Sequence, residues 1–456
     1  MREYLAGQFI QMSDPIGKNK REKQDHLPRG VALLESDTRI VHLFFLVFSL
    51  FFLFASPFAG PLDQLIPGFV RILTSPQVLT TDACALGGLN GALLNAGLLG
   101  LLSWALMKFS GDTATGASFS AFFLTLGYAF FGMNCLNVLP LILGTWIFSK
   151  IKRRLFRNYV NLSLFACSLA PLVSEALFPR YYDYSLLIGI PLALLLGLLI
   201  GVIFPLFAAH TAGMHKGHSL FNAGLTAGLL GLALFALYKT LVLAPLGVVS
   251  DYQLNSILST GYPLFFPLAL AALFTATLLA GILLNGRSFK GYGNLLRQSG
   301  YKCDFLAQEG AARVFINFGF LGLMALLYMV LVKAPFTGPT VTSILCLACL
   351  SATGSHLLNV LPIMAGYGLV SIFAMWTLGT QAIVVGVCFA TCLSPISGRG
   401  GWLWGLAAGA LHAGLVSYMP VLHGGFNLYN GGFTAGLAAI ILVPLLEYYK
   451  KTPVPE

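Results

Sequence analysis

The chain has 456 residues, of which 57% are hydrophobic and only 42 carry a formal charge. Charged residues make up 9% of the sequence, whereas they make up about 25% of an ordinary soluble domain. Since 13 of the charges precede residue 40, the rest of the chain has too few charges to cover a soluble surface. The composition excludes a soluble enzyme, a nucleic-acid-binding protein and a disordered chain. It predicts a multi-pass membrane protein, whose main partner is the lipid bilayer.

The predicted elements follow a polar segment, 1–39, which is too long and too mixed in charge to open a cleavable signal peptide. Apolar stretches of about 17–25 residues have the length of a membrane-spanning helix. Such stretches predict five crossings at 40–60, 84–108, 159–178, 185–208 and 219–247. Five more are predicted at 262–285, 309–332, 378–393, 402–418 and 428–447, and a short tail, 448–456, follows them. The predicted fold class is therefore an all-α polytopic membrane protein.

An apolar hairpin lies between the second and third crossings of each set, at 117–149 and 341–371. Each hairpin is interrupted by the sequence Leu-Asn-Val-Leu-Pro, in which Pro140 and Pro362 remove a backbone donor. The short arms predict two half-helices that return to the side where they started. The hairpin can be re-entrant, or it can be a tight pair of fully spanning helices.

Three sequence blocks occur twice. Residues 131–140 recur as 353–362, and residues 95–101 recur as 317–323, both at an offset of 222. The third block, 215–229, recurs as 423–437 at an offset of 208, with nine of its fifteen positions identical. Since the blocks keep their order, the chain is predicted to consist of two homologous halves, 40–250 and 260–447.

The basic residues predict how the chain is oriented in the membrane. With a cytoplasmic N-terminus, the predicted crossings place 22 Lys and Arg residues inside and four outside. This distribution agrees with the excess of Lys and Arg in cytoplasmic loops. Because five crossings per half is an odd number, the second half is expected to be inverted relative to the first. We therefore expect a plasma-membrane protein with both termini in the cytoplasm.

Inverted repeats are typical of transporters and channels, whose substrate path lies at the repeat interface near the bilayer midplane. Interrupted helices at membrane depth are tolerated where they are buried in protein or line a water-filled cavity. These features predict a transporter or channel for a small polar solute. An integral-membrane enzyme or a lipid-handling protein is the alternative. The sequence is compatible with either a monomer or a homo-oligomer.

The hairpin interruptions contain the first two candidate site residues, Asn137 and Asn359. An Asn side chain offers both donors and acceptors, so this pair can replace water around a polar solute. If the halves cross at the midplane, the two side chains are expected to face one cavity from opposite sides. Each could equally cap its own half-helix, and one residue can do both.

Further repeated polar residues extend the candidate substrate path. They are the pairs Asn95 and Asn317, Asn222 and Asn430, Thr226 and Thr434, and His215 and His423. Helix-to-helix hydrogen bonding is the alternative role for the Asn pairs, and Thr can bond to its own helix. The histidines could form a polar gate at each mouth or lie in interfacial loops.

Two candidates have no repeated partner. His356 replaces Asn134 in the second hairpin, and Glu175 is the only carboxylate well inside a predicted crossing. The repeated blocks contain no Asp or Glu, which favours passive passage of the solute. No nucleotide, nucleophile or zinc motif is present, so no cofactor or metal is expected.

The paired Leu-Asn-Val-Leu-Pro and Asn-x-Gly-(Leu/Phe)-Thr-Ala-Gly-Leu blocks resemble a family of bacterial and archaeal membrane proteins. That family is built from two copies of one uncharacterised region, and membership implies no known function. Residues 88–100 also resemble a Gly-Leu-Asn-Gly-Tyr-Asn stretch of urea transporters, which have two inverted halves of five helices with a re-entrant pore helix. The doubled Asn-Asn-Pro of urea transporters is missing here, so this resemblance implies an architecture and not a solute.

Single cysteines placed in the basic loops 150–157 and 286–303 test the predicted orientation. Both loops are expected to react with a membrane-impermeant thiol reagent only from the cytoplasmic side, because cytoplasmic loops hold the clustered Lys and Arg. Labelling of intact cells and of inverted membrane vesicles measures this. Reaction of either loop from outside intact cells contradicts the inverted arrangement.

Overall fold

The computed structural model describes residues 29–181, 183–247 and 257–450. Much of the predicted polar N-terminal segment, 1–28, and the end of the tail, 451–456, lie outside the described residues. The first half contains α2 (Arg29–Ala55), α3 (Leu65–Thr74), α4 (Ala83–Ser110), α5 (Gly116–Tyr128), α6 (Leu139–Ile151), α7 (Val160–Ala166), α8 (Ala170–Leu177), α9 (Leu186–Met214) and α10 (Asn222–Tyr238). The second half contains α11 (Phe265–Leu284), α12 (Tyr292–Leu296), α13 (Phe305–Leu331), α14 (Gly338–Cys349), α15 (Leu357–Ser371), α16 (Gln381–Ala390), α17 (Ser394–Gly400), α18 (Trp402–Val416), α19 (Met419–Leu422) and α20 (Asn430–Lys450).

Nine helical segments of the described chain are long and apolar enough to cross a membrane. They are Glu35–Phe58, Ala83–Ser110, Val160–Leu177, Leu186–Met214, Asn222–Leu243, Phe265–Leu284, Phe305–Leu331, Gln381–Gly400 and Asn430–Tyr449. These segments match nine of the ten predicted crossings. The tenth, predicted at 402–418, is α18, whose 15 residues are too few for a hydrocarbon core about 30 Å thick. By length and composition, the all-helical multi-pass fold is confirmed.

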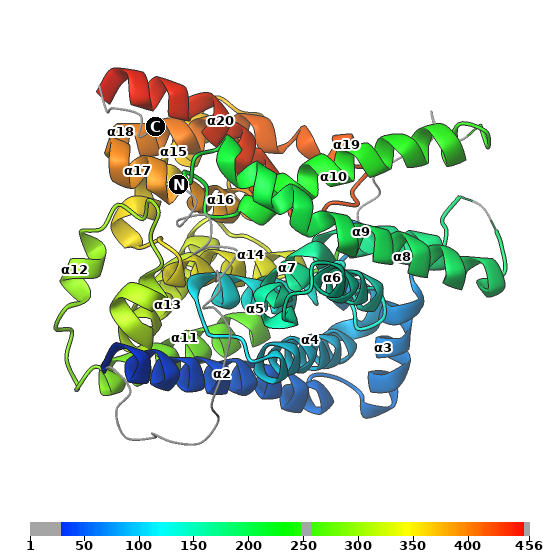
Figure 1. Cartoon of the computed structure of the whole chain (residues 1–456), viewed down its shortest axis with the longest axis horizontal. Helices are drawn as coiled ribbons and strands as arrows, with labels where there is room; N and C mark the ends of the chain where they lie inside the picture. Colours follow the sequence, from blue (N-terminus) through cyan, green and yellow to red (C-terminus); the bar gives the residue numbers. More distant parts are fainter. Residues whose placement is uncertain (1–28, 182, 248–256, 451–456) are drawn as a thin grey trace.

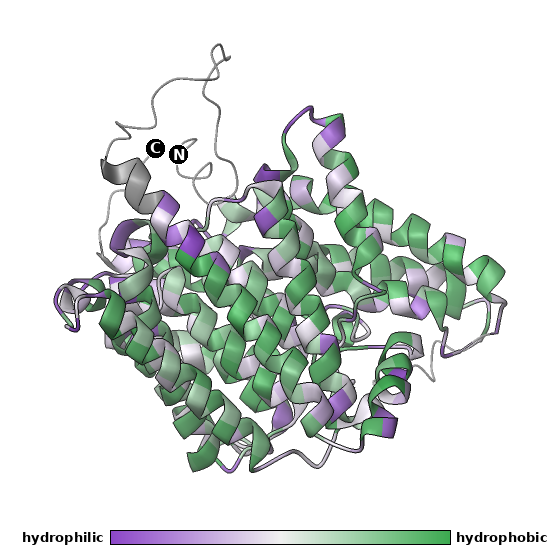
Figure 2. Cartoon of the chain, turned by 90° about the horizontal axis from the view of Figure 1, so that it is seen from below, coloured by the Kyte–Doolittle hydropathy of each residue, from purple (hydrophilic) through white to green (hydrophobic). Residues whose placement is uncertain are grey.

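The helices lie mostly lengthwise in one bundle. In Figure 1, α2 and α4 run between one end, where α12 lies, and the opposite end, where α3 lies. Hydrophobic residues cover most of the ribbon in Figure 2, while hydrophilic residues gather near turns and helix ends. Large apolar side chains point outward from the crossings; the exposed fraction is 85% at Leu187 and 67% at Leu268. Such a surface is suited to lipid rather than to water.

Each predicted hairpin is a pair of short helices. α5 and α6 have 13 residues each, and α14 and α15 have 12 and 15. The interruption precedes the proline in both hairpins: Pro140 lies in the first turn of α6, and Pro362 lies inside α15. The residues between the arms, 129–138 and 350–356, form turns and a short 3-10 helix.

Two further interruptions were not predicted from the sequence. The third crossing of each half changes to a 3-10 turn in its middle, at Cys167–Leu169 and at Thr391–Leu393. A proline follows each turn in the first turn of the next helix, Pro171 in α8 and Pro395 in α17. Because proline has no N–H to donate, it is tolerated at the start of a helix. Both crossings were predicted to be continuous.

The two halves repeat the same hydrogen bonds. Asn95 in α4 donates to the carbonyl oxygens of Ala129 and Met133 at 2.7 and 2.9 Å. Asn317 in α13 makes the same pair of bonds, at 3.0 and 2.8 Å, to the equivalent carbonyls of the second half, those of Ser351 and Ser355. Both α4 and α13 are kinked at a glycine with a positive φ: φ is 74° at Gly88 in α4 and 80° at the equivalent Gly310 in α13. The sequence repeat is therefore also a repeat of local structure.

Close contacts between the halves form the middle of the bundle. α5 packs against α14 in the antiparallel sense, since Gly116 lies against Ala352 and Gly338 lies against Phe130. α10 packs against α20. There, a Cβ on Gly224 would lie only 2.5 Å from the carbonyl carbon of Gly432. Small residues permit this approach, as they do at many helix interfaces in membranes.

Replacing Gly224 with Ala tests the α10–α20 contact. The added methyl group has no room beside Gly432, so the variant is expected to lose about 1–3 kcal/mol of stability. Gly414→Ala in α18 is the matched control, because a Cβ there meets nothing within 4 Å. Thermal unfolding in detergent measures both, and equal unfolding midpoints for the two variants contradict the contact.

Candidate functional site

Asn137 acts as a cap for the first hairpin. Its Oδ1 accepts from the Asn134 backbone N–H at 2.9 Å. Its Nδ2 donates to the Gly132 carbonyl at 3.1 Å and to the Ser174 hydroxyl at 2.9 Å. These bonds satisfy backbone groups that the interrupted helix leaves free. Both the oxygen and the nitrogen of the buried Asn137 amide are therefore hydrogen-bonded.

Asn359 caps the second hairpin in the same way. Its Oδ1 accepts from the His356 N–H at 2.9 Å, and its Nδ2 donates to the Gly354 carbonyl at 2.9 Å. The two caps do not meet: Asn137 bonds to α8, whereas Asn359 lies beside Gly300, in the loop that follows α12. The expectation that they face one cavity from opposite sides is therefore not met. Their geometry is that of caps.

Three other candidates also have structural partners. Asn95 and Asn317 hold the turns of the hairpins through the bonds described above, and the Asn317 Oδ1 also accepts from Tyr292. The ring Nε2 of His356 lies 2.8 Å from the carbonyl of Gln298, in the loop that precedes α13. These contacts join helices and loops to one another, in agreement with the packing alternative.

In the first half, the candidate residues of the third repeated block, His215, Asn222 and Thr226, are all hydrogen-bonded. The Nε2 of His215 lies 3.0 Å from the Oδ1 of Asn222, the first residue of α10. The Nδ2 of Asn222 donates to the carbonyl of Ala208 in α9 at 2.9 Å. The hydroxyls of Thr226 and Thr211 are 2.7 Å apart. Together these bonds fix the start of α10 against α9.

The same block is bonded differently in the second half. The Nε2 of His423 lies 3.1 Å from the carbonyl of Gly228 in α10 rather than beside an Asn oxygen. Thr434 bonds back to the carbonyl of Asn430 at 2.9 Å, as Thr226 does to Asn222 at 3.1 Å. Asn430 is 4% exposed, yet its Oδ1 has no hydrogen-bond partner among the described residues. The His423 ring lies beside this amide and interacts with it weakly, but its Nδ1 makes no hydrogen bond of ordinary geometry to the described residues. The two members of this Asn pair therefore have different surroundings.

Two cavities lie at the starts of α20 and α10. The first, which we call the α20 cavity, has a volume of about 120 Å³ and is lined by Asn430, Gly431, Pro339 and Phe131, among others. The second, the α10 cavity, has a volume of about 40 Å³, and its walls include the residues equivalent to those four: Asn222, Ala223, Ala117 and Thr353. The members of each equivalent pair are related by one of the two offsets of the sequence repeat. Both halves of the chain contribute to each cavity.

The cavities lie toward opposite ends of the bundle. Pro420 of α19 lines the α20 cavity together with Leu79 and Thr80, in the segment between α3 and α4. Cys303 and Asp304, in the segment between α12 and α13, line the α10 cavity. In Figure 1, α3 and α12 lie at opposite ends of the molecule.

A row of aromatic rings connects the wall of one cavity to the wall of the other. Phe131, in the wall of the α20 cavity, stacks on Tyr128 with ring centroids 5.7 Å apart. The Tyr128 ring lies 6.2 Å from that of Phe389, which lies 5.4 Å from the Phe221 ring in the wall of the α10 cavity. We call these four residues the aromatic barrier. The hydroxyl of Tyr128 donates to the carbonyl of Leu428 and so fixes the barrier to the segment before α20.

A pair of carboxylates was not predicted from the sequence. Asp82 accepts from the Cys84 N–H at 2.8 Å and from the hydroxyl of Ser259 at 2.6 Å. Asp304, the equivalent residue of the second half, accepts from the N–H groups of Ala307 and Gly116 at 3.0 Å. Burial raises the pKa of the Asp304 carboxyl, and the N–H donors oppose that rise.

Asp82 and Asp304 could have been identified from the sequence, because they are separated by the 222-residue offset of the repeat. Asp82 and Asp304 each lie shortly ahead of the repeated Gly88 and Gly310, but outside the three blocks that were compared. The prediction of passive passage relied on the three blocks, which contain no carboxylate. The repeat outside the blocks does contain one, and Asp304 lines the α10 cavity, so passive passage stays a prediction.

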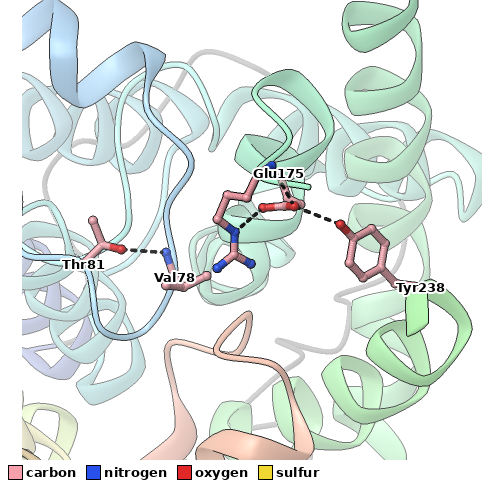
Figure 3. Close-up of polar contacts among 5 residues, drawn as sticks. Val78, Thr81, Glu175 and Tyr238 are labelled. Carbon is pink, nitrogen blue, oxygen red and sulfur yellow. Dashed lines mark hydrogen bonds and ion pairs between the residues drawn. The ribbon is translucent and has the colours of Figure 1, made fainter. Parts of the chain in front are cut away.

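Glu175 belongs to an ion pair near the end of α8. Its Oε2 lies 2.8 Å from the Nε of Arg180, and its Oε1 accepts from the hydroxyl of Tyr238 at 2.8 Å. Figure 3 shows Tyr238 on one side of the carboxylate and the segment that carries Val78 on the other. Counting from the 3-10 turns, the residue in the same place in the second half is Arg399, near the end of α17. In the described chain, Glu175 therefore takes part in an ion pair that connects the end of α8 to Arg180, with Tyr238 as a further hydrogen-bond donor.

The chain belongs to the family described as Protein of unknown function (DUF1576), which matches residues 62–240 and 284–448. The starts of the two matched regions, and likewise their ends, differ by the same offsets as the repeated blocks. No curated protein and no solved structure matches the chain. The predicted membership of an uncharacterised family with a two-part sequence is confirmed, and the resemblance to urea transporters stays a prediction.

Replacing Asn137 with Leu tests its role as a cap. The variant leaves the Asn134 N–H and the Gly132 carbonyl without their partner, so each group is expected to cost about 1–3 kcal/mol of stability. Asn294→Leu, at an exposed position in α12, is the control. Thermal unfolding in detergent measures the difference. An unfolding midpoint for Asn137→Leu equal to that of the control would refute the capping role.

Proposed function

We propose that this protein is a membrane transporter or channel that passes a small polar solute between the α20 cavity and the α10 cavity. The observation that carries the proposal is the pair of cavities, whose walls share equivalent positions of the two halves. The aromatic barrier lies between them. A path with one cavity toward each end and a closed middle suits a solute that enters from one side and leaves from the other.

The contacts between the halves support an inverted arrangement. Asp304 of the second half accepts from the first N–H of α5, which belongs to the first half. Reciprocally, the first residue of α14, Gly338, lies against Asp82: a Cβ there would lie 2.4 Å from its carboxylate. The same contact made twice with the halves exchanged indicates a two-fold relation, and the antiparallel packing of α5 and α14 supports an axis in the membrane plane.

The charged residues near the α10 cavity favour the cytoplasmic side for that end. Arg399 stacks on the ring of Tyr301 at 4.3 Å, and Lys302 follows in the segment that lines the cavity. Lys216, at the end of α9, pairs with Glu447 near the end of α20 at 2.7 Å. Clustered Lys and Arg belong to cytoplasmic ends of membrane proteins. The α20 cavity would then open to the outside.

Flux measurements on protein reconstituted into liposomes test the proposal. Stopped-flow light scattering with a panel of small neutral and anionic solutes is expected to reveal at least one that crosses faster than in protein-free liposomes. The alternative function, an integral-membrane enzyme or a lipid-handling protein, predicts no such difference for any solute. That result would remove the transport proposal.

Replacing Phe389 with Ala tests the aromatic barrier. Removing the central ring is expected to join the two cavities and raise solute flux, at a cost of about 3–5 kcal/mol of stability because a buried ring is lost. Phe54→Ala removes a ring that is 65% exposed and is the control. Flux per folded protein is compared after size-exclusion chromatography. Unchanged or lower flux in folded Phe389→Ala would mean that these rings do not close the path.

A further inference from the structure

Asn222 and Asn430, which line the two cavities, differ in the hydrogen-bond partners of their side-chain amides. The Nδ2 of Asn222 donates to the carbonyl of Ala208 at 2.9 Å, and its Oδ1 is bonded to His215. Asn430 occupies the same place at the start of α20 and is 4% exposed, but its Oδ1 has no partner among the described residues. The neighbouring His423 ring faces this amide and interacts with it weakly, but no hydrogen bond of ordinary geometry joins the two. A buried amide oxygen without a partner is costly, so it marks a place where a bound group would be stabilised.

The backbone around Asn430 adds donors to the same wall. Asn430 and Gly431 begin α20 and line the α20 cavity. The first N–H groups of a helix have no partner within it, and those of Asn430 and Gly431 have no acceptor elsewhere in the described chain. The start of a helix carries a partial positive charge, which favours an acceptor oxygen and disfavours a cation. The wall therefore offers donors from the backbone together with a donor and an acceptor from the side chain.

The size and lining of the cavity restrict what can bind. A dry cavity of about 150 Å³ holds a molecule as large as benzene, so 120 Å³ accommodates about five non-hydrogen atoms. The α10 cavity, at 40 Å³, has room for about one water. Among the described residues that line the α20 cavity, which include Leu79, Leu258 and Val385, there is no Lys, Arg, Asp or Glu. A full charge there would be buried without a counter-charge, which is unfavourable.

We infer that Asn430 is the solute-binding residue of the α20 cavity, and that the solute is a small uncharged molecule with a donor and an acceptor bonded to the same carbon. A primary amide has this arrangement. Its oxygen accepts from the N–H groups at the start of α20 or from the Nδ2 of Asn430, and its N–H donates to the Oδ1. The inference rests on the proposed function for the direction of movement, but the binding site itself can be tested without transport.

The first half indicates what happens when the α20 cavity closes. The residue equivalent to Ala208, at the offset of the third block, is Val416, which lines the α20 cavity at the end of α18. If the second half adopted the arrangement of the first, the Asn430 amide would bond to the carbonyl of Val416. Closure of the α20 cavity would then replace the solute with the Val416 carbonyl as the partner of the Asn430 amide. The carbonyl of Ala208 is already the partner of the Asn222 amide in the first half. The solute and this carbonyl compete for one amide.

Four probes of equal size test the inference: acetamide, acetone, acetate and acetamidinium. They share a planar frame of non-hydrogen atoms and differ only in charge and in donors and acceptors. We expect acetamide to raise the unfolding midpoint of the purified wild-type protein the most, with no effect on Asn430→Leu. Asn294→Leu is the control, because Asn294 is exposed in α12 and should keep the wild-type response. Asn430→Asp, which keeps the size but replaces the amide donor with a carboxyl group, should also lose the response.

Flux of the same four probes into proteoliposomes provides the second readout. The preference for acetamide over acetone is expected to fall by about tenfold or more in Asn430→Leu, since a site that hydrogen-bonds its solute discriminates by that interaction. A larger stabilisation by acetate or acetamidinium overturns the uncharged class. An acetamide response that persists in both Asn430 variants overturns the assignment of Asn430. Flux with an unchanged preference contradicts only this inference, whereas no flux of any solute contradicts the proposed function.

Discussion

The constraint on which the structure depends is that backbone polar groups inside the membrane must find partners within the protein. This bundle interrupts helices in both hairpins and in both third crossings. Asn137 and Asn359 satisfy the groups that the hairpin interruptions leave free. Because the caps complete those bonds within the protein, the interruptions can lie deep in the bundle beside close helix contacts. The cavities exist because helices begin there, at α10 and α20, rather than at the surface.

The two halves of the chain repeat most of their local structure, and the positions where they differ bear on function. The bonds by which the hairpin caps and the Asn95 and Asn317 amide nitrogens hold the hairpin turns recur in both halves, as expected of parts that hold the fold, although the Asn317 Oδ1 also accepts from Tyr292 whereas the Asn95 Oδ1 has no partner among the described residues. The third block differs: Asn222 is bonded at both ends of its amide, whereas the Oδ1 of Asn430 has no partner in the described chain. The cavity beside Asn222 is also the smaller one. We interpret this difference as one half closed and the other open, in keeping with a path that opens at one end at a time.

The sequence predicted the parts of the structure that follow from local pattern. Apolar length located nine crossings, and the repeated blocks located both hairpins and the two-part division of the chain. The partners of the polar residues could not be predicted, because they depend on which helices meet. Asn137 was expected to face Asn359, yet its partners are in its own hairpin and in α8. The aromatic barrier was not predicted either, since Tyr128 and Phe389 belong to different halves of an aromatic-rich sequence and carry no motif.

The central claim is that the two cavities open to opposite faces of the membrane and are separated by the aromatic barrier. Single cysteines at Ala382, in the α20 cavity, and at Ala117, in the α10 cavity, test it most directly. Each variant is exposed to a small membrane-impermeant thiol reagent from one side at a time, with the wild-type protein as the background for its own cysteines. The account predicts that Ala382→Cys reacts only from outside and that Ala117→Cys reacts only from the cytoplasm. Reaction of both cysteines from the same side would contradict it.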